Sequence, residues 1–175
     1  MIQGRIFSGL TKLCDISLSP GYGALVGITQ EELEVNFASD IQEMQIGRPD
    51  LLTQIKDWYY GYTWDMQIWV YNPFSLLNFM ISGVFRSYWY HTSAATFLYK
   101  LCRKKVLYDV ECKQIGLHRL MVFNAEDPDP YSLLFQTGYL TIKNTTGSDQ
   151  EFELCYPNRE VKEGFLGGLL NIYRS

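Results

Sequence analysis

The chain has 175 residues, of which 47% are apolar and 19% charged, and its formal net charge is −4. This length accommodates one domain or two small ones with a sizeable core, and the negative charge argues against a surface that binds nucleic acid throughout. Apolar runs are far shorter than the ~20 residues of a membrane span and no secretory leader is recognisable, so we expect a cytoplasmic protein without a membrane partner.

The cysteines and histidines give no sign of a metal site. They are scattered and never adopt the spacing of zinc ligands: Cys14, Cys102, Cys112, Cys155, His91 and His118. We expect reduced thiols that fill space as small apolar side chains. A general-base role for either histidine would need a nucleophile or carboxylate beside it, so we expect hydrogen-bonded histidines at the core or its boundary.

Helix-start signals divide the first part of the chain. The serine–proline pair at 19–20 predicts a short helix that ends near Gly27. Thr29 and Glu32 predict a capping box, and the helix that follows extends to Gly47. The residues expected to face the core on this helix share helical spacing: Leu33, Phe37, Ile41 and Met44.

Residues 58–92 contain all four tryptophans and predict the hydrophobic centre of the chain. A helix opened by Pro49 ends at Gly61, an aromatic loop with a short strand at 68–71 follows, and Asn72 caps a second helix. The residues expected to face the core on the second helix are Phe74, Leu77, Ile81 and either Val84 or Phe85.

The aromatic stretch has a second interpretation, as a surface on which bases or sugars stack. That interpretation requires Trp64 and Trp69 to be exposed together on one face. We favour burial, because each aromatic side chain can bury about 150–250 Å². Asp65 in the loop could contact a ligand, but loop aspartates more often cap turns.

The second half predicts another helix and then a mixed segment. A helix over 94–105, capped by Thr92, ends in the basic cluster 103–105, where cations suit a helix C-terminus. Residues 118–123 are predicted to form a short strand. Asp129 caps a short helix that ends at Gln136.

Two alternating segments, 139–143 and 150–156, predict a hairpin whose second strand buries Phe152, Leu154 and Tyr156. A final helix starts after Pro157 and carries an apolar stripe: Val161, Phe165, Leu169 and Ile172. The predicted fold is therefore mostly α, or α+β: a helical, bundle-like domain over 1–113, followed by a small winged-helix-like unit over 114–175 with one β-hairpin.

Motifs for common chemistries are missing or weak. A phosphate-binding loop is absent, because no lysine in the chain follows a glycine. Two Glu-x-Lys pairs match the end of a metal-dependent nuclease pattern: Glu111 with Lys113, and Glu160 with Lys162, which follow Asp149. Glu160 and Lys162 fall at a predicted helix start rather than on a strand, which disfavours that interpretation.

Six segments resemble successive blocks of the bacterial AAA-ATPase-like proteins that usually carry a PD-(D/E)XK nuclease domain at their C-terminus: IFSGLTKLCDISLSPGYGALVGITQEELE, IKDWYYGYTWD, VYNPFSLLNFM, YWYHTSAATFL, LLFQTGYLTIK and FELCYPNREVKEGF. The resemblance implies that 1–28 are the end of an ATPase core, followed by its helical lid and a winged-helix-like segment. It implies that the phosphate-binding region lies upstream and the nuclease domain downstream. Residues 11–12 and 91–95 depart from the family pattern, which puts a nucleotide-sensing role in doubt.

We therefore expect a non-catalytic interaction or regulatory module with no catalytic, cofactor-binding or metal-binding residues. Its expected partner is a protein, either the missing ATPase half or a second copy, and an exposed apolar patch near 6–16 would mark where that partner docks. The alternatives are a nucleic-acid-binding winged-helix-like module that uses 103–105 and, less favoured, a Mg²⁺-dependent nuclease. The acidic wing, with Asp149, Glu151 and Glu153, favours protein contact over DNA.

Overall fold

The computed structural model of the chain describes residues 16, 18, 19, 21–89, 95–107, 110, 111, 113–121, 124, 126–145 and 151–174. Several sequence predictions lie outside these residues. They are the part of the ATPase-core remnant before residue 16 and the roles considered for Cys14, His91, Thr92, Cys112 and Asp149.

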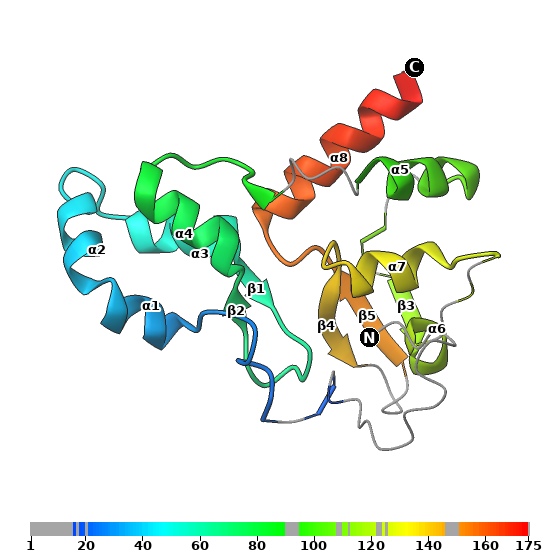
Figure 1. Cartoon of the computed structure of the whole chain (residues 1–175), viewed down its shortest axis with the longest axis horizontal. Helices are drawn as coiled ribbons and strands as arrows, with labels where there is room; N and C mark the ends of the chain where they lie inside the picture. Colours follow the sequence, from blue (N-terminus) through cyan, green and yellow to red (C-terminus); the bar gives the residue numbers. More distant parts are fainter. Residues whose placement is uncertain are drawn as a thin grey trace.

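The predicted mixed fold is confirmed: eight helices and two small antiparallel sheets occur in the described part of the chain (Figure 1). In chain order the elements are α1 (Gln30–Asn36), α2 (Ala38–Met44), α3 (Leu51–Tyr59), β1 (Tyr60–Tyr62), β2 (Val70–Tyr71), α4 (Pro73–Ser82), α5 (Ala95–Lys104), β3 (Lys113–Gly116), α6 (Leu117–Met121), α7 (Pro130–Gln136), β4 (Thr141–Thr145), β5 (Glu151–Cys155) and α8 (Arg159–Arg174). None of the helices in this part of the chain combines the length and apolar character needed to cross a membrane.

The first packing unit, here called the helical unit, consists of α1–α4 and the β1–β2 hairpin (Figure 1). Its core is formed by one cluster of buried side chains: Leu33, Ile41, Leu51, Ile55, Tyr59, Tyr71, Leu76, Phe79 and Tyr88. The predicted caps are confirmed. The Glu32 amide donates to Thr29 Oγ1 at 3.2 Å, and Asn72 Oδ1 accepts from the Phe74 amide at 3.0 Å.

Two predictions for the start of this unit are wrong. Residues 21–26 form turns rather than a helix. The single helix predicted up to Gly47 is interrupted at Phe37, whose φ of −115° and ψ of 21° leave the helical region. Leu33 on α1 and Ile41 on α2 are nevertheless buried in the same core, as the helical spacing predicts.

The predicted inner face of α4 is also wrong. The residues that α4 buries are Ser75, Leu76 and Phe79. Most of the stripe expected to face the core is exposed instead: Phe74 53%, Leu77 40%, Ile81 86% and Val84, just beyond the helix, 55%. Phe85, the predicted alternative to Val84, is half-buried and packs against the core as expected. Both faces of α4 are apolar, so helical periodicity alone could not identify the buried one.

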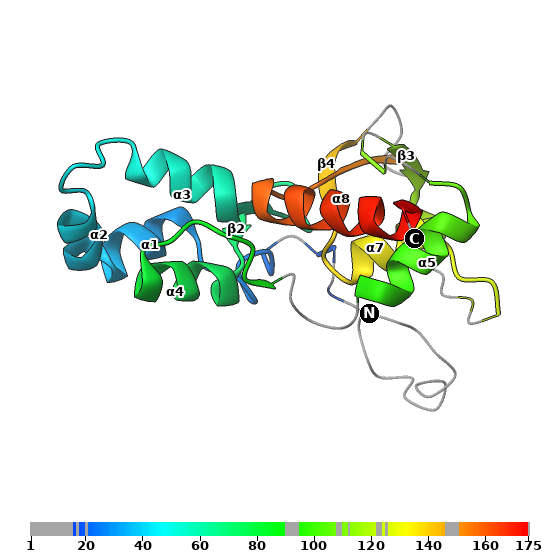
Figure 2. The same cartoon turned by 90° about the horizontal axis from the view of Figure 1, so that it is seen from above.

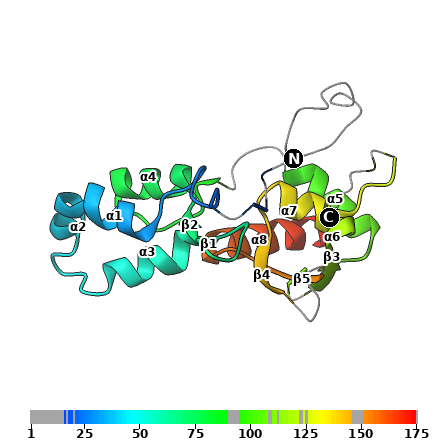
Figure 3. The same ribbon diagram turned by 90° about the horizontal axis from the view of Figure 1, so that it is seen from below.

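The second packing unit, here called the mixed unit, consists of α5–α8 around a three-stranded sheet of order β3-β5-β4. The predicted hairpin is confirmed as β4 and β5, which pair Ile142 with Leu154. The apolar stripe on α8 is also confirmed, since Val161, Phe165 and Leu169 are buried. Helix α8 joins the units, because it contacts α3 of the helical unit and packs along α5 (Figures 2 and 3).

Two elements of the mixed unit differ from the sequence prediction. Residues 117–121 form helix α6 rather than a strand, in keeping with a segment that contains no β-branched residue. The buried carbonyl of Leu120 accepts hydrogen bonds from Ser132 Oγ and Gln136 Nε2, both at 3.0 Å. Strand β3, which the sequence analysis does not predict, pairs with β5 and extends the hairpin to three strands.

Helix α5, which the predicted division after residue 113 places with the first domain, packs against elements of the mixed unit. Helix α5 packs against α7 and α8, and the Tyr99 and Phe165 ring centroids lie 5.2 Å apart. Leu98, Leu101 and Cys102 are buried in the same cluster as the sheet. Helix α5 therefore packs as part of the mixed unit.

Candidate functional site

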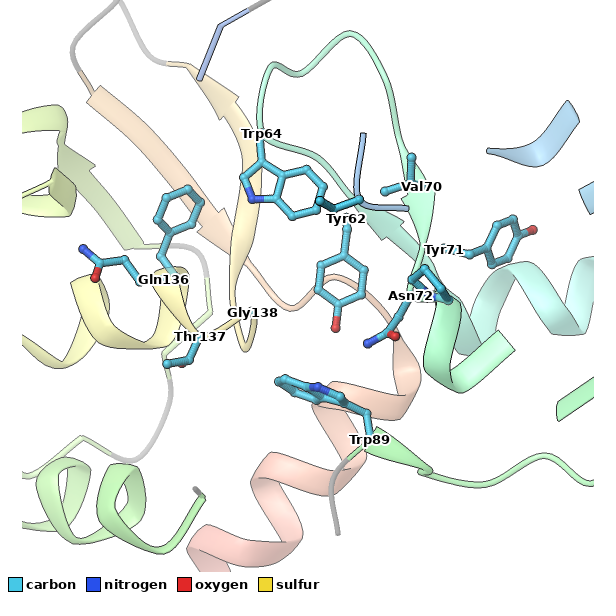
Figure 4. A pocket seen from close by; sticks show the side chains of 12 residues that line it. Tyr62, Trp64, Val70, Tyr71, Asn72, Trp89, Gln136, Thr137 and Gly138 are labelled. Carbon is cyan, nitrogen blue, oxygen red and sulfur yellow. The ribbon is translucent and has the colours of Figure 1, made fainter. Parts of the chain in front are cut away.

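A pocket of about 260 Å³ lies where the β1–β2 hairpin of the helical unit meets the α7–β4 turn of the mixed unit (Figure 4). Here it is called the junction pocket. Trp64 and Trp89 lie at its two ends, Tyr62 and Asn72 on one side, and the α7–β4 turn on the other (Figure 4). Its walls are Val26, Tyr62, Trp64, Val70, Tyr71, Asn72, Pro73, Trp89, Phe135, Gln136, Thr137 and Gly138.

Close backbone contacts fix the two sides of the pocket against each other. The Thr63 amide donates to Thr141 Oγ1 at 3.0 Å, and that hydroxyl donates to the Thr63 carbonyl at 2.8 Å. At Gly61, where φ is 126°, a Cβ would lie only 2.0 Å from the Pro157 carbonyl oxygen. Only glycine allows this approach of β1 to the segment before α8.

Two polar atoms of residues that line the junction pocket, the Tyr62 hydroxyl and Gln136 Oε1, are buried and have no hydrogen-bond partner of regular geometry. Burial raises the pKa of the Tyr62 hydroxyl, and the Asn72 side chain, which faces it, opposes the shift in part (Figure 4). Asn72 Oδ1 is already engaged, since it accepts from the backbone amides at the start of α4. The amide nitrogen is the side of Asn72 that faces the hydroxyl (Figure 4).

Beside the pocket, the fully buried Glu160 on α8 fixes the segment that follows α4. Its Oε1 accepts from the Tyr88 amide at 2.6 Å and the Trp89 amide at 2.9 Å. The Ser87 hydroxyl donates to the Glu160 carbonyl at 3.1 Å. Burial raises the pKa of the Glu160 carboxyl, although hydrogen bonds from Ser75, Trp89 and Tyr88 lower it in part. Glu160 is therefore a structural anchor for Trp89.

The two nuclease-like pairs do not form a metal site in the described residues. Lys162 pairs with Glu111 at 2.7 Å, whereas Glu160 Oε1 accepts from two backbone amides. Glu160 lies on a helix, as the sequence predicts. Among described residues, no group of three or more His, Cys, Asp or Glu side chains gathers as metal ligands would.

The basic cluster 103–105 is largely engaged within the protein. Arg103 Nη1 donates to the Ile172 carbonyl at 3.0 Å, near the end of α8. Lys105 pairs with Asp127 at 2.7 Å, which lowers the pKa of that carboxyl. In the wing, Lys143 pairs with Glu153 at 3.0 Å. These cations already have partners, so they offer a weak electrostatic footprint for phosphate.

The remaining candidate polar residues are Asp65, which has a structural role, and His118. Asp65 is buried, and its Oδ1 accepts from the Gln67 and Ile68 amides, both at 2.9 Å. Burial raises its pKa, but these amides outweigh that effect and lower it, as expected for a turn-capping aspartate. His118 is exposed on α6, away from the junction pocket.

The tryptophans divide between core, pocket and surface. Trp58 stacks on Phe85 with ring centroids 5.9 Å apart. The Arg159 guanidinium lies over the Trp58 ring, 4.7 Å from its centroid. Trp64 and Trp89 are half-buried and line the junction pocket, while Trp69, at 37% exposure, does not. Trp64 and Trp69 are therefore not exposed together on one face, so the condition for the stacking surface considered from the sequence is not met. Gly138 was not predicted as a site residue. The only cue in the sequence is its position just after the predicted end of helix α7.

Exposed apolar side chains form two groups on the helical unit. The first, here called the α4 apolar face, consists of Phe74, Leu77, Ile81 and Val84. The second surrounds a hollow of about 210 Å³ and includes Tyr22, Leu25 and Val26, close in sequence to the predicted patch near 6–16. Large exposed apolar groups on a folded protein commonly mark contact surfaces.

A relative from Azotobacter chroococcum mcd 1, described as an uncharacterized protein in the vnfD 5' region, is 35% identical to the chain over 172 residues. The alignment covers 96% of this chain and 32% of the relative, so the chain spans about a third of the length of the curated relative it matches. No known family profile matches the chain. No solved structure matches it either.

Proposed function

We propose that this chain is a cytoplasmic, non-catalytic interaction module of an AAA-ATPase-like protein, without nucleotide hydrolysis of its own. The observation that carries the proposal is the α4 apolar face, where Phe74, Leu77, Ile81 and Val84 are 40–86% exposed along one helix and its C-terminal end. The six sequence blocks that resemble this family support it, as does the missing phosphate-binding loop.

The proposed partner is the remainder of a longer protein of the same kind. The Azotobacter relative supports this choice, because about two thirds of its length lies outside the region that resembles this chain. Helix α4 contains no charged residue, so the contact would depend on burial of apolar area rather than on ion pairs. Binding should therefore change little with salt concentration.

Calorimetry with the parts of the relative outside the aligned region tests this proposal. Ile81→Glu should weaken binding at least about tenfold, since a charge would be buried in an apolar contact. Leu170→Glu is the matched control, because Leu170 is 56% exposed on α8 in the other unit. The purified chain should not hydrolyse ATP. Turnover by the chain alone, or equal effects of the two variants, would overturn the proposal.

The nucleic-acid alternative rests on the element order. The series α5–β3–α6–α7–β4–β5, with sheet order β3-β5-β4, supports a winged-helix-like architecture. However, α7, the helix before the wing, buries Pro130 and every residue from Tyr131 to Phe135, which leaves little surface to enter a groove. Mobility shifts at low salt distinguish the nucleic-acid-binding module from the interaction module. The wild type is compared with a Lys104→Ala/Lys105→Ala double variant. Binding lost in that variant would favour this alternative.

A further inference from the structure

We propose that the junction pocket binds a small, neutral, planar heteroaromatic molecule that carries a hydrogen-bond acceptor. This inference goes beyond the interaction module and does not depend on it. A pocket of about 260 Å³ lies just below the roughly 300–1,000 Å³ of typical small-molecule sites, which limits the ligand to one or two rings.

The shape of the pocket favours a flat ring. Tyr62 and Trp64 stack with centroids 6.4 Å apart and planes only 18° apart, and the Trp89 ring closes the opposite end (Figure 4). Gly138 forms part of the other wall, where a Cβ would lie 3.7 Å from Tyr62 Cε1 and 3.8 Å from Trp89 Cζ2. A planar molecule beside Tyr62 would contact π-faces with little loss of side-chain entropy, because these rings are already packed.

The polar side of the pocket points to an acceptor on the ligand. Tyr62 lines the pocket and is only 6% exposed, and its buried hydroxyl lacks a regular hydrogen bond. Asn72 turns its amide nitrogen toward it, while Asn72 Oδ1 accepts from the Phe74 amide (Figure 4). Because the Asn72 amide nitrogen can donate to the Tyr62 oxygen, the Tyr62 O–H is the donor left over, and a carbonyl oxygen or ring nitrogen would satisfy it. A buried donor left unpaired destabilises the protein, and such a ligand would remove part of that cost.

The charge of the pocket excludes an ionic ligand. None of the described residues that line it is Asp, Glu, Lys, Arg or His. A phosphate or carboxylate buried there would lose its hydration without a cation to replace it. A free, neutral heterocycle therefore fits this pocket better than a nucleotide does.

The test uses quinolin-2-one, a neutral two-ring lactam, with quinoline-2-carboxylate as the anionic control. Binding is followed by the indole N–H signals of the four tryptophans in ¹H–¹⁵N spectra of the full chain. The Trp64 and Trp89 signals should shift and saturate at or below about 1 mM ligand, while those of Trp58 and Trp69 stay in place. The carboxylate should bind at least about tenfold more weakly.

Tyr62→Phe removes the donor but keeps the ring. It should weaken quinolin-2-one binding about 3- to 10-fold, the usual contribution of one hydrogen bond, while thermal stability in the absence of ligand is retained or rises. Trp69→Ala, outside the pocket, should leave affinity unchanged. Absence of saturable shifts in the folded protein, equal shifts of all four tryptophans, unchanged affinity in Tyr62→Phe or tighter binding of the carboxylate would each overturn the proposal.

Discussion

Replacement of Glu160 should show how strongly the segment after α4 depends on one buried carboxylate. In Glu160→Ala the amides of Tyr88 and Trp89 lose the oxygen they share at 2.6 and 2.9 Å. Tyr88 is only 8% exposed, so water cannot readily replace that acceptor. Two lost charge-assisted hydrogen bonds, offset by relief of carboxylate burial, amount to a loss of about 2–3 kcal/mol in unfolding free energy.

Glu160→Gln should cost less, about 1 kcal/mol, because the amide oxygen can still accept from both backbone groups. For a chain of this size, the Ala variant should lower Tm by about 4–12 °C. Urea unfolding monitored by circular dichroism measures both variants. Glu163→Gln is the control, since Glu163 lies on the same helix but is exposed and paired with Arg159 at 2.6 Å. Equal effects of Glu160→Ala and Glu163→Gln would refute the reasoning.

The unfolding free energy of the wild type should depend on pH through the same carboxyl group. Burial raises the pKa of Glu160 in the folded state above its unfolded value. The folded protein therefore binds the Glu160 proton more tightly than the unfolded chain does. The contribution of Glu160 to the unfolding free energy is fully present below the unfolded pKa and is lost as pH rises through the raised folded pKa. The stability of the wild type relative to Glu160→Gln should fall over that window. A difference that is constant or grows with pH would contradict the assignment.

Three further predictions concern single positions. Thr29→Ala should cost about 1 kcal/mol in urea unfolding, because it removes the capping box, whereas Thr53→Ala on exposed α3 surface should cost less. Gly138→Ala should cost about 1–2 kcal/mol, because a φ of 81° strains any residue with a Cβ; no change would argue against that backbone conformation. Burial raises the pKa of Cys102 to about 11, so iodoacetamide at pH 8 should modify it, by peptide mass spectrometry, only after unfolding in urea.

Local rules predicted the parts of the fold that depend on neighbours in sequence. The caps at Thr29, Asn72 and Asp129 occur where side-chain spacing places them, because each oxygen reaches amides only two or three residues away. The alternation in β5 and the stripe on α8 were also correct, since each has a single apolar face. Such one-sided patterns leave no doubt about which side is buried.

Tertiary contacts determine the buried face of α4 and the composition of the junction pocket, which sequence patterns alone did not predict. Helix α4 has two apolar faces, and the one that carries Leu76 and Phe79 is buried because Phe79 stacks on Phe85 at 4.3 Å. The junction pocket combines Tyr62, Trp89 and Gly138 from three distant segments, and no spacing rule connects them. The aromatic density of 58–92 was visible in the sequence, but which rings would share a cavity depended on how the two units pack.

The binding affinity between this chain and the unaligned parts of the Azotobacter relative is the measurement that tests the interaction module most directly. We predict a salt-insensitive complex that Ile81→Glu weakens at least about tenfold and Leu170→Glu leaves intact. Ile81 is 86% exposed, so the variant should fold like the wild type, which circular dichroism verifies. A folded Ile81→Glu chain that binds as tightly as the wild type, or no complex at all, would contradict the account.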